Sequence, residues 1–303
     1  MSHNNFDVII IGGSYSGLAA GMALGRALKK VLIIDSGNAC NSQTPYSHNF
    51  LTNDGKAPKE INNIARQQVQ HYETIVFLED KALAGAVLTN GFQIQVLSGQ
   101  TFYAKKLIFA TGIKDILPPI PGLAACWGIS VLHCPFCHGY EVRNEPTGIL
   151  GNGVAAYEFS VLISNWTNNL TVFTNGTSTL TVDQTSALNR RKIKVVENEI
   201  EYLIHTGGHL EKIAFKNASP FLLGALYSPA PFEQHCQIPG DLGCQFSEEG
   251  YIIVDAFQET TVPGIFACGD NTTKTRTVAN AVAMGTTAGM SVSKKIIMEE
   301  FNK

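Results

Sequence analysis

The feature that most constrains this chain is a glycine-rich turn near its start. Residues 6–11 read FDVIII, a run typical of a buried parallel strand, and the turn GGSYSG follows at 12–17. A helical pattern covers residues 18–30, and a second apolar run ends at Asp35. Strand, glycine turn, helix, strand and acid in this order predict a dinucleotide-binding βαβ unit.

The positions of this turn have separate physical roles. Gly12 permits the tight turn, position 14 lets the backbone approach a pyrophosphate, and Gly17 allows the helix to pack close to the strand. Ser14 departs from the usual second glycine, but a small serine still fits and its hydroxyl can donate to phosphate. Asp35 lies where a carboxylate accepts hydrogen bonds from a ribose hydroxyl.

A second turn of this kind lies in the middle of the chain, between the apolar runs TGIL and LTVF. Its positions are Gly151, Gly153 and Ala156, and the position that corresponds to Asp35 is Thr174. The run TNGTSTLT at 174–181 contains neither an acid for a 2′-hydroxyl nor a base for a 2′-phosphate. We therefore expect a second nucleotide-type unit whose preference for NADH or NADPH is undefined. Neutral hydrogen bonds from Thr174 and Asn175 to a ribose are an alternative.

A pair of cysteines in the run HCPFCH at 133–138 has four possible meanings: a redox dithiol, a c-type haem attachment, a zinc site, or buried packing. Haem attachment normally follows export, and zinc ligand pairs are normally about a dozen residues apart. Both considerations favour the redox pair, Cys134 and Cys137. His138 could stabilise a thiolate as an imidazolium or take a proton from a thiol as a neutral base, and His133 is a second candidate.

Composition excludes several classes of protein. The net charge of −3 and the scattered basic residues argue against nucleic-acid binding. No run of eighteen apolar residues predicts a membrane span, and the first residues lack the basic region of a signal peptide, so we expect a cytoplasmic protein. The seven cysteines do not form a secreted disulfide framework, and no metal site is expected.

The order and spacing of these motifs resemble those of the low-molecular-weight thioredoxin reductases over essentially the whole chain. The shared features are Asp35, the ATG at 110–112, the CxxC, the second glycine turn and the pair Gly269-Asp270. Within that family, CPFCHGYE is most similar to the branch that includes fungal dithiol oxidases, which close disulfides in small natural products.

The resemblance implies an α/β fold with two Rossmann-like domains, the second inserted in the first. The FAD domain would cover 1–115 and 240–303, and residues 116–239 would carry the CxxC, with PPIPG and IPGDLG as connecting strands. It also implies FAD as cofactor and a homodimer. The residues expected at the FAD are Gly12, Ser14, Gly17, Asp35, Asn49, Thr111, Gly112, Gly269, Asp270, Thr277 and Val278.

By resemblance, Cys137 is the sulfur nearer the flavin and Cys134 exchanges with the substrate, a thioredoxin-like protein or a small dithiol or disulfide. Two departures from the family are visible: His138 replaces the acid that normally follows the second cysteine, and the basic cluster that selects NADPH is missing. The sequence therefore predicts an FAD-dependent disulfide oxidoreductase whose electron partner is NADPH, NADH, ferredoxin or O₂. A non-catalytic redox sensor is the alternative.

Overall fold

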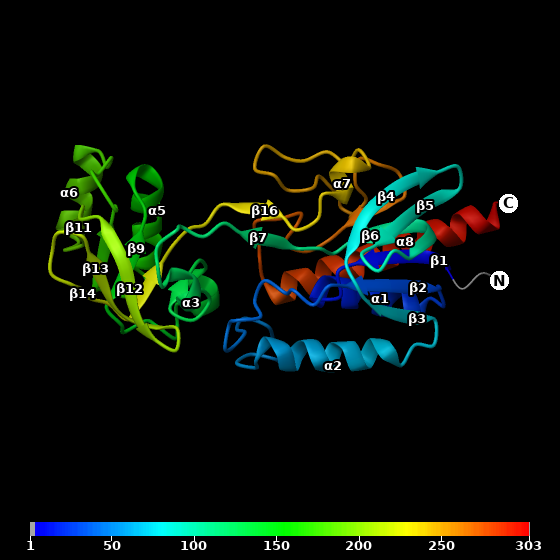
Figure 1. Cartoon of the computed structure of the whole chain (residues 1–303), viewed down its shortest axis with the longest axis horizontal. Coiled ribbons are helices and arrows are strands. Elements are labelled where there is room, and N and C mark those ends of the chain that lie inside the picture. Colours follow the sequence, from blue (N-terminus) through cyan, green and yellow to red (C-terminus); the bar gives the residue numbers. More distant parts are fainter. Residues whose placement is uncertain (1–3, 303) are drawn as a thin grey trace. The chain divides into compact units, whose positions relative to one another are not determined.

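The computed structural model describes residues 4–302 and divides into two compact units, each with its own sheet built around parallel strands (Figure 1). The first unit comprises the chain up to Ser42, Asn49–Lys114 and the chain from Phe232 onward. The second unit comprises Gln43–His48 and Asp115–Pro231.

The sheet of the first unit has the strand order β3-β2-β1-β6-β5-β4, and β17 also pairs with β6. Strands β1, β2, β3, β6 and β17 are parallel, whereas β4, β5 and the first half of β6 form an antiparallel meander. The strands are β1 (Asn5–Ile11), β2 (Val31–Asp35), β3 (Ile75–Glu79), β4 (Ala82–Leu88), β5 (Gly91–Val96), β6 (Thr101–Phe109) and β17 (Ile265–Ala267). The helices are α1 (Tyr15–Arg26), α2 (Pro58–Gln70), α7 (Ile238–Asp241) and α8 (Val278–Phe301).

Strand β1 is buried on both faces, as its apolar sequence predicts. Val8 and Ile10 join the core that includes α1 and α8, while Ile9 and Ile11 join the core under the meander. Because alternate side chains point to opposite faces of a sheet, one run of β-branched residues serves both cores.

Helices α1 and α8 pack with almost no gap between their backbones. A Cβ atom at Gly285 would lie 2.1 Å from the carbonyl oxygen of Ser16, and one at Gly289 would lie 2.6 Å from that of Ala20. The close approach of the two helices therefore requires glycine at positions 285 and 289.

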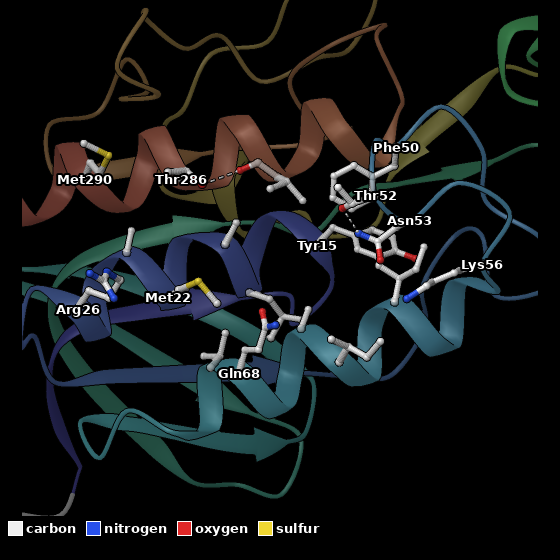
Figure 2. Close-up of a pocket in the computed structure, with 18 residues that line it drawn as sticks. Tyr15, Met22, Arg26, Phe50, Thr52, Asn53, Lys56, Gln68, Thr286 and Met290 are labelled. Atoms are coloured by element: carbon white, nitrogen blue, oxygen red, sulfur yellow. Dashed lines mark hydrogen bonds between the residues drawn. The ribbon is translucent and has the colours of Figure 1, made fainter.

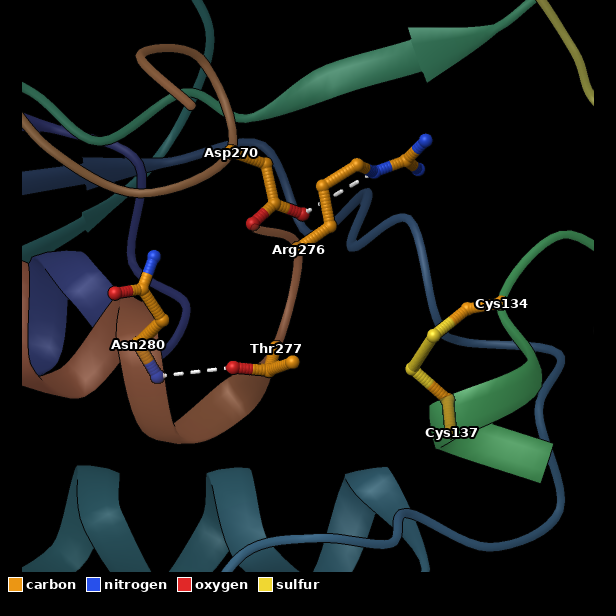
Figure 3. The surroundings of a disulfide bond; sticks show 6 residues. All are labelled: Cys134, Cys137, Asp270, Arg276, Thr277 and Asn280. Atoms are coloured by element: carbon orange, nitrogen blue, oxygen red, sulfur yellow. Dashed lines mark hydrogen bonds and ion pairs between the residues drawn. A yellow bond between two sulfur atoms is a disulfide. The ribbon is translucent and has the colours of Figure 1, made fainter. Parts of the chain in front are cut away.

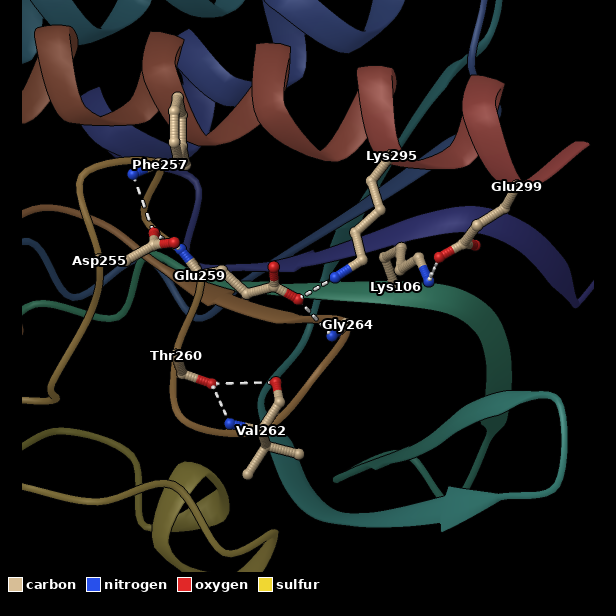
Figure 4. A network of polar contacts seen from close by, with 9 residues as sticks. All are labelled: Lys106, Asp255, Phe257, Glu259, Thr260, Val262, Gly264, Lys295 and Glu299. Atoms are coloured by element: carbon tan, nitrogen blue, oxygen red, sulfur yellow. Dashed lines mark hydrogen bonds and ion pairs between the residues drawn. The ribbon is translucent and has the colours of Figure 1, made fainter. Parts of the chain in front are cut away.

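Ion pairs fix the C-terminal half of α8 to the sheet (Figure 4). The Glu259 carboxylate accepts from the Lys295 ammonium and from the Gly264 N–H at 2.8 Å. Lys106 on β6 donates to Glu299 at 2.7 Å. The loop before β17 and the last helix thus share one polar network.

The second unit contains a five-stranded parallel sheet of order β11-β10-β9-β15-β8 and a separate three-stranded antiparallel sheet of order β12-β13-β14. Its strands are β8 (Val131–Leu132), β9 (Thr147–Leu150), β10 (Leu170–Phe173), β11 (Lys194–Val196), β12 (Ile200–Thr206), β13 (His209–Phe215), β14 (Phe221–Leu222) and β15 (Ala225–Tyr227). Its helices are α3 (Leu123–Cys126), α4 (Pro135–His138), α5 (Gly153–Ile163) and α6 (Val182–Arg190). Both units have parallel βαβ cores, which confirms the α/β prediction.

The boundaries between the units differ in detail from those expected from the sequence. The return to the first unit comes at Phe232 because β16 (Phe232–Gln234) pairs with β7 (Ile113–Asp115). The IPGD stretch, expected to be a connecting strand, forms the helical turn α7 instead. Residues 43–48 belong to the second unit, which the sequence did not indicate.

Candidate active site

The two cysteines of the CxxC motif are joined in a disulfide, Cys134–Cys137, with their Cα atoms 5.4 Å apart (Figure 3). Strand β8 ends at Leu132, and Cys134 is the N-cap of the one-turn helix α4, with Pro135 buried at its first position. Of the four meanings of this motif, the structure therefore has the dithiol/disulfide pair. Within residues 4–302, no cluster of three or more His, Cys, Asp or Glu side chains is arranged to hold a metal ion.

His138 ends α4 and is only partly exposed. Burial lowers the pKa of His138, the Glu141 carboxylate raises it, and His48 lowers it. Because burial is the largest of these effects, the imidazole is neutral near neutral pH and suited to accept a proton. The base role is therefore favoured over the imidazolium role.

The aromatic neighbours of the disulfide are held within the second unit. The His133 ring stacks on Trp127 with centroids 5.8 Å apart and an interplanar angle of 23°. Phe136 is 64% exposed and meets Trp166 edge-on at 5.4 Å. Phe136 is thus a large apolar side chain on the surface of the second unit, within the disulfide-bonded CxxC turn.

The first glycine turn has the geometry that its sequence requires. Gly12 has φ +105°, and a Cβ there would lie 2.2 Å from the carbonyl oxygen of Ala110. A Cβ at Gly17 would lie 1.9 Å from the carbonyl oxygen of Gly12. Ser14 is the N-cap of α1 but makes no capping bond with its side chain. The N–H groups at this helix start are therefore not occupied by the capping hydroxyl.

Gly13, which the fingerprint of the turn does not single out, lies against Asp35. A Cβ at Gly13 would be 2.8 Å from the Cβ and 2.9 Å from the Cγ of Asp35. The carboxylate at the end of β2 is therefore close to the glycine turn. The doubled glycine was the signal that could have identified this position.

The carboxyl ends of β6 and β17 are linked by Asn271, another residue missed from the sequence. Its fully buried amide donates to the Phe109 carbonyl at 2.9 Å and lies 3.4 Å from the Thr111 hydroxyl. Gly112 (φ +62°) and Gly269 (φ +92°) adopt the left-handed backbone conformation that glycine tolerates at these strand ends. Four of the positions expected at the FAD lie at these two strand ends: Thr111, Gly112, Gly269 and Asp270.

The remaining expected residues lie on loops and helix starts of the first unit. Asp270 lies 3.8 Å from the guanidinium of Arg276 (Figure 3). Thr277 caps α8, which begins at Val278, by accepting from the Asn280 N–H at 3.1 Å. Asn49 has φ +62°, and its N–H donates to Asp54 at 2.7 Å.

The second glycine turn is engaged by its own chain. The Asn152 side-chain oxygen accepts from the N–H of Gly153 at 2.9 Å and from the N–H of Thr179 at 2.8 Å. The Asn152 amide donates to the Thr177 carbonyl at 2.9 Å. A Cβ at Gly153 would be 2.9 Å from the Thr179 hydroxyl, which shows how closely the loop after β10 covers the turn. Ala156 is buried inside α5.

Thr174 and Asn175 are also engaged by the backbone. The Thr174 hydroxyl donates to the Gly176 carbonyl at 2.6 Å, and the Asn175 side chain accepts from the Ile200 N–H at 2.7 Å. Both side chains considered as neutral ribose ligands therefore already have partners.

The model of the pyridine nucleotide-disulphide oxidoreductase family matches residues 6–285. The chain belongs to this family. A thioredoxin reductase of Claviceps purpurea is 32% identical over 99% of this chain and 97% of its own length. Among solved structures, an oxidoreductase from Agrobacterium tumefaciens is 35% identical with a TM-score of 0.91, over 97% of this chain and 99% of its own. A putative thioredoxin reductase of Bacillus anthracis is 27% identical with a TM-score of 0.93, over 98% and 100%.

These similarities confirm the family resemblance, the two Rossmann-like domains and the enzyme class. The chain is a flavoprotein disulfide oxidoreductase of the thioredoxin reductase type. Family membership implies a flavin and a pyridine nucleotide as cofactors. None of the described helices combines the length and apolar character needed to cross a membrane.

Proposed function

We propose that electrons pass between FAD and the Cys134–Cys137 disulfide, and from there to or from a thioredoxin-like protein or a small dithiol. The observation that carries this proposal is the disulfide itself, closed across one turn of helix with a neutral imidazole, His138, directly after it. FAD, when bound, supplies a two-electron carrier for this exchange.

The first unit fits FAD in three respects. Gly12 and Gly17 leave no room for side chains against the Ala110 and Gly12 carbonyls, so the strand turns into the helix as tightly as a dinucleotide-binding unit requires. Asp35 lies against Gly13 at the end of β2, where an adenosine ribose would be bound. The buried side-chain oxygen of Asn271 has no hydrogen-bond partner within residues 4–302, so it is able to accept a bond from a ligand.

The remaining positions follow from the resemblance. The residues proposed to hold FAD are Gly12, Ser14 and Gly17 at the pyrophosphate, Asp35 at the ribose, Asn49 at the ring, Thr111, Gly112, Gly269 and Asp270 along the cofactor backbone, and Thr277 and Val278 at the start of α8.

The thiol exchange assigns a role to each of the two cysteines and to His138. A substrate thiol gives its proton to His138, and its sulfur forms a bond with Cys134 while the Cys134–Cys137 bond breaks and leaves its electron pair on Cys137. The second substrate thiol then loses its proton and displaces Cys134, so that the substrate leaves as a disulfide. Disulfide reduction is the same sequence in reverse.

Stopped-flow mixing of the purified flavoprotein with a dithiol tests this proposal. The flavin absorbance should fall with the wild type, and a Cys137→Ser variant should leave it unchanged at equal flavin content. A Cys137→Ser variant that turns over at the wild-type rate would contradict the role of the disulfide.

A second candidate function, oxidation of dithiols by O₂, is favoured by the second glycine turn. The N–H groups that would bind a nucleotide phosphate there include those that donate to Asn152, and Thr174 replaces the ribose-binding acid. The net reaction is dithiol plus O₂ giving disulfide plus hydrogen peroxide. Fast bleaching of the flavin by NADPH or NADH would exclude this candidate, whereas O₂ uptake on adding dithiol without nucleotide would support it.

We also infer a homodimer, which rests on the resemblance and on one surface of the first unit. A pocket of about 720 Å³ opens between α1, α2 and α8 and is lined mainly by apolar side chains (Figure 2). Met290 at its rim is 63% exposed. A second copy of the chain would remove this apolar surface from water.

A further inference from the structure

Four ionisable or hydroxyl side chains gather beside the disulfide within the second unit. His48 Nε2 lies 3.5 Å from Glu141 Oε1. His138, directly after Cys137, interacts electrostatically with both Glu141 and His48, and Tyr227 interacts with Glu141. The carboxylate therefore lies 3.5 Å from one imidazole and interacts electrostatically with a second imidazole and with a phenol.

His48 reaches this cluster on a short segment from a distant part of the sequence. Residues 43–48 belong to the second unit, although the residues on either side of them belong to the first. Gln43 anchors the segment by donating to the Ala124 and Ala125 carbonyls at 3.1 and 2.9 Å. A Cβ at Gly128 would lie 2.7 Å from the Thr44 hydroxyl, so the unit has a glycine where the segment approaches it.

Tyr227 comes from the strand next to the one that leads into the disulfide. Its Cα is paired with that of Leu132, two residues before Cys134. Tyr227 is 1% exposed, and its hydroxyl makes no hydrogen bond within the described part of the chain. Burial raises the pKa of Tyr227, and the charge of Glu141 raises it further, so the phenol keeps its proton at neutral pH.

The number of protons released in dithiol oxidation indicates what this cluster could do. Oxidation of a dithiol to a disulfide releases two protons, one from each thiol, whereas one neutral imidazole accepts one. His138 must therefore pass on the first proton before it can act on the second thiol. A carboxylate that interacts with two imidazoles stabilises a proton on either ring. Glu141 is 39% exposed, so it also connects the cluster to solvent.

We propose that Glu141 and His48 are positioning residues for thiol exchange, with Glu141 holding His138 and with His48 receiving the proton that His138 removes from the substrate. This inference rests on the proposed function and extends it to two residues outside the cysteine motif. No redox change occurs at this pair: one N–H bond forms on His48 as one breaks on His138.

The electrostatics predict opposite effects for the two residues. Glu141 raises the pKa of His138 and His48 lowers it. The nearby cation Arg143 is directed elsewhere, since its guanidinium lies over the Tyr140 ring and donates to the Tyr140 carbonyl. Removing Glu141 should therefore move the titration of His138 to lower pH, and removing His48 should move it to higher pH.

The experiment measures the rate of anaerobic flavin reduction by dithiothreitol against pH in the full-length flavoprotein. Glu141→Gln should slow the reaction about tenfold, below the roughly 10²–10⁴-fold effect of an acid–base group itself, and should shift the midpoint of the rate profile downward. His48→Gln should shift it upward, and Glu141→Asp should restore part of the rate. Glu201→Gln and His209→Gln, at exposed positions of the same unit, are the matched controls.

Each outcome has a distinct meaning. Profiles of Glu141→Gln and His48→Gln that superimpose on the wild type overturn the inference while the proposed function stands. Failure of dithiothreitol to reduce the wild-type flavin contradicts the proposed function itself. Glu141→Gln could lose its flavin or its far-ultraviolet circular dichroism. In that case Glu141→Asp and His48→Gln are the variants that test the inference. If the midpoint of the rate profile is unshifted in both, the inference is overturned.

Discussion

The side-chain oxygen of Asn152 accepts hydrogen bonds from two backbone N–H groups, Gly153 at 2.9 Å and Thr179 at 2.8 Å. At the start of a helix in a dinucleotide-binding unit, such donors normally face a phosphate. Here the neutral side-chain amide of Asn152 accepts these two hydrogen bonds instead. The same side chain is the N-cap of α5.

Asn152→Ala should lower the free energy of unfolding by about 1 kcal/mol, because it removes the N-cap of α5 and a link to the loop after β10. Urea unfolding followed by circular dichroism measures the change. Asn168→Ala, at an exposed position of the same unit, is the control. Equal stability of the two variants would show that the cap contributes nothing.

Gly17→Ala should abolish or strongly reduce flavin binding. The new methyl group would lie 1.9 Å from the Gly12 carbonyl oxygen, so the turn must shift, at a cost of about 1–3 kcal/mol. Flavin content after purification and the thermal midpoint are the measurements. Gly240→Ala is the matched control, because its methyl group would only touch Phe246 at 3.4 Å. A Gly17→Ala protein with full flavin content would show that flavin binding tolerates a shift of this turn.

Cys268 should make the protein less stable in alkali. Burial raises the pKa of this thiol to about 12 from the ordinary 9.0. Between these values the folded chain keeps the proton that the unfolded chain loses, so stability falls as pH rises, by about 1.4 kcal/mol per pH unit.

Urea unfolding of Cys268→Ala between pH 8 and about 10.5 should show a shallower loss of stability than the wild type, since the titrating thiol is gone. Cys40→Ala, which removes an exposed thiol, should keep the wild-type slope. Identical slopes for all three proteins would mean that the Cys268 thiol titrates alike in the folded and unfolded chains.

Lys295→Ala should destabilise the first unit by about 1 kcal/mol, since Lys295 and Glu259 are largely covered and the carboxylate also holds the Gly264 N–H. Lys274→Ala breaks a pair with Glu249 in which both side chains are well exposed, and it should leave the unfolding midpoint unchanged. If the two variants lose the same stability, the covered network contributes no more than a surface pair.

Met290→Glu should weaken the inferred homodimer, because it would bring a charge onto the apolar rim of the pocket between α1, α2 and α8. Light scattering after size-exclusion chromatography at several protein concentrations gives the mass. Val182→Glu, which changes an apolar residue of the second unit that is 82% exposed, should leave the mass unchanged. A wild-type protein of monomeric mass at every concentration would refute the dimer.

Local patterns predicted the two βαβ units well, because each is set by residues close together in the chain. The run FDVIII lies in β1, and the helical pattern that follows the glycine turn forms α1. The cysteine pair could also be predicted, since both sulfurs lie within one turn of helix. In each case the strand, helix or disulfide is determined by its own short stretch of sequence.

Contacts between residues that are far apart in the sequence could not be predicted. No spacing rule pairs His48 with Glu141, because the segment that carries His48 joins the second unit through long-range hydrogen bonds. Likewise, Thr179 reaches Asn152 only because β10 returns the chain to the glycine turn. Asn271 follows a recognisable Gly-Asp pair, but its bridge to Phe109 depends on β6 and β17 being neighbours.

The membership of residues 43–48 in the second unit has a practical consequence for protein engineering. A fragment excised at Asp115 and Pro231, or a chimaera that exchanges that stretch with a relative, would leave Gln43 and His48 behind. Glu141 would then lose His48, although His138 and every residue of the cysteine motif were transplanted intact. Grafting this redox centre therefore requires two discontinuous pieces of chain.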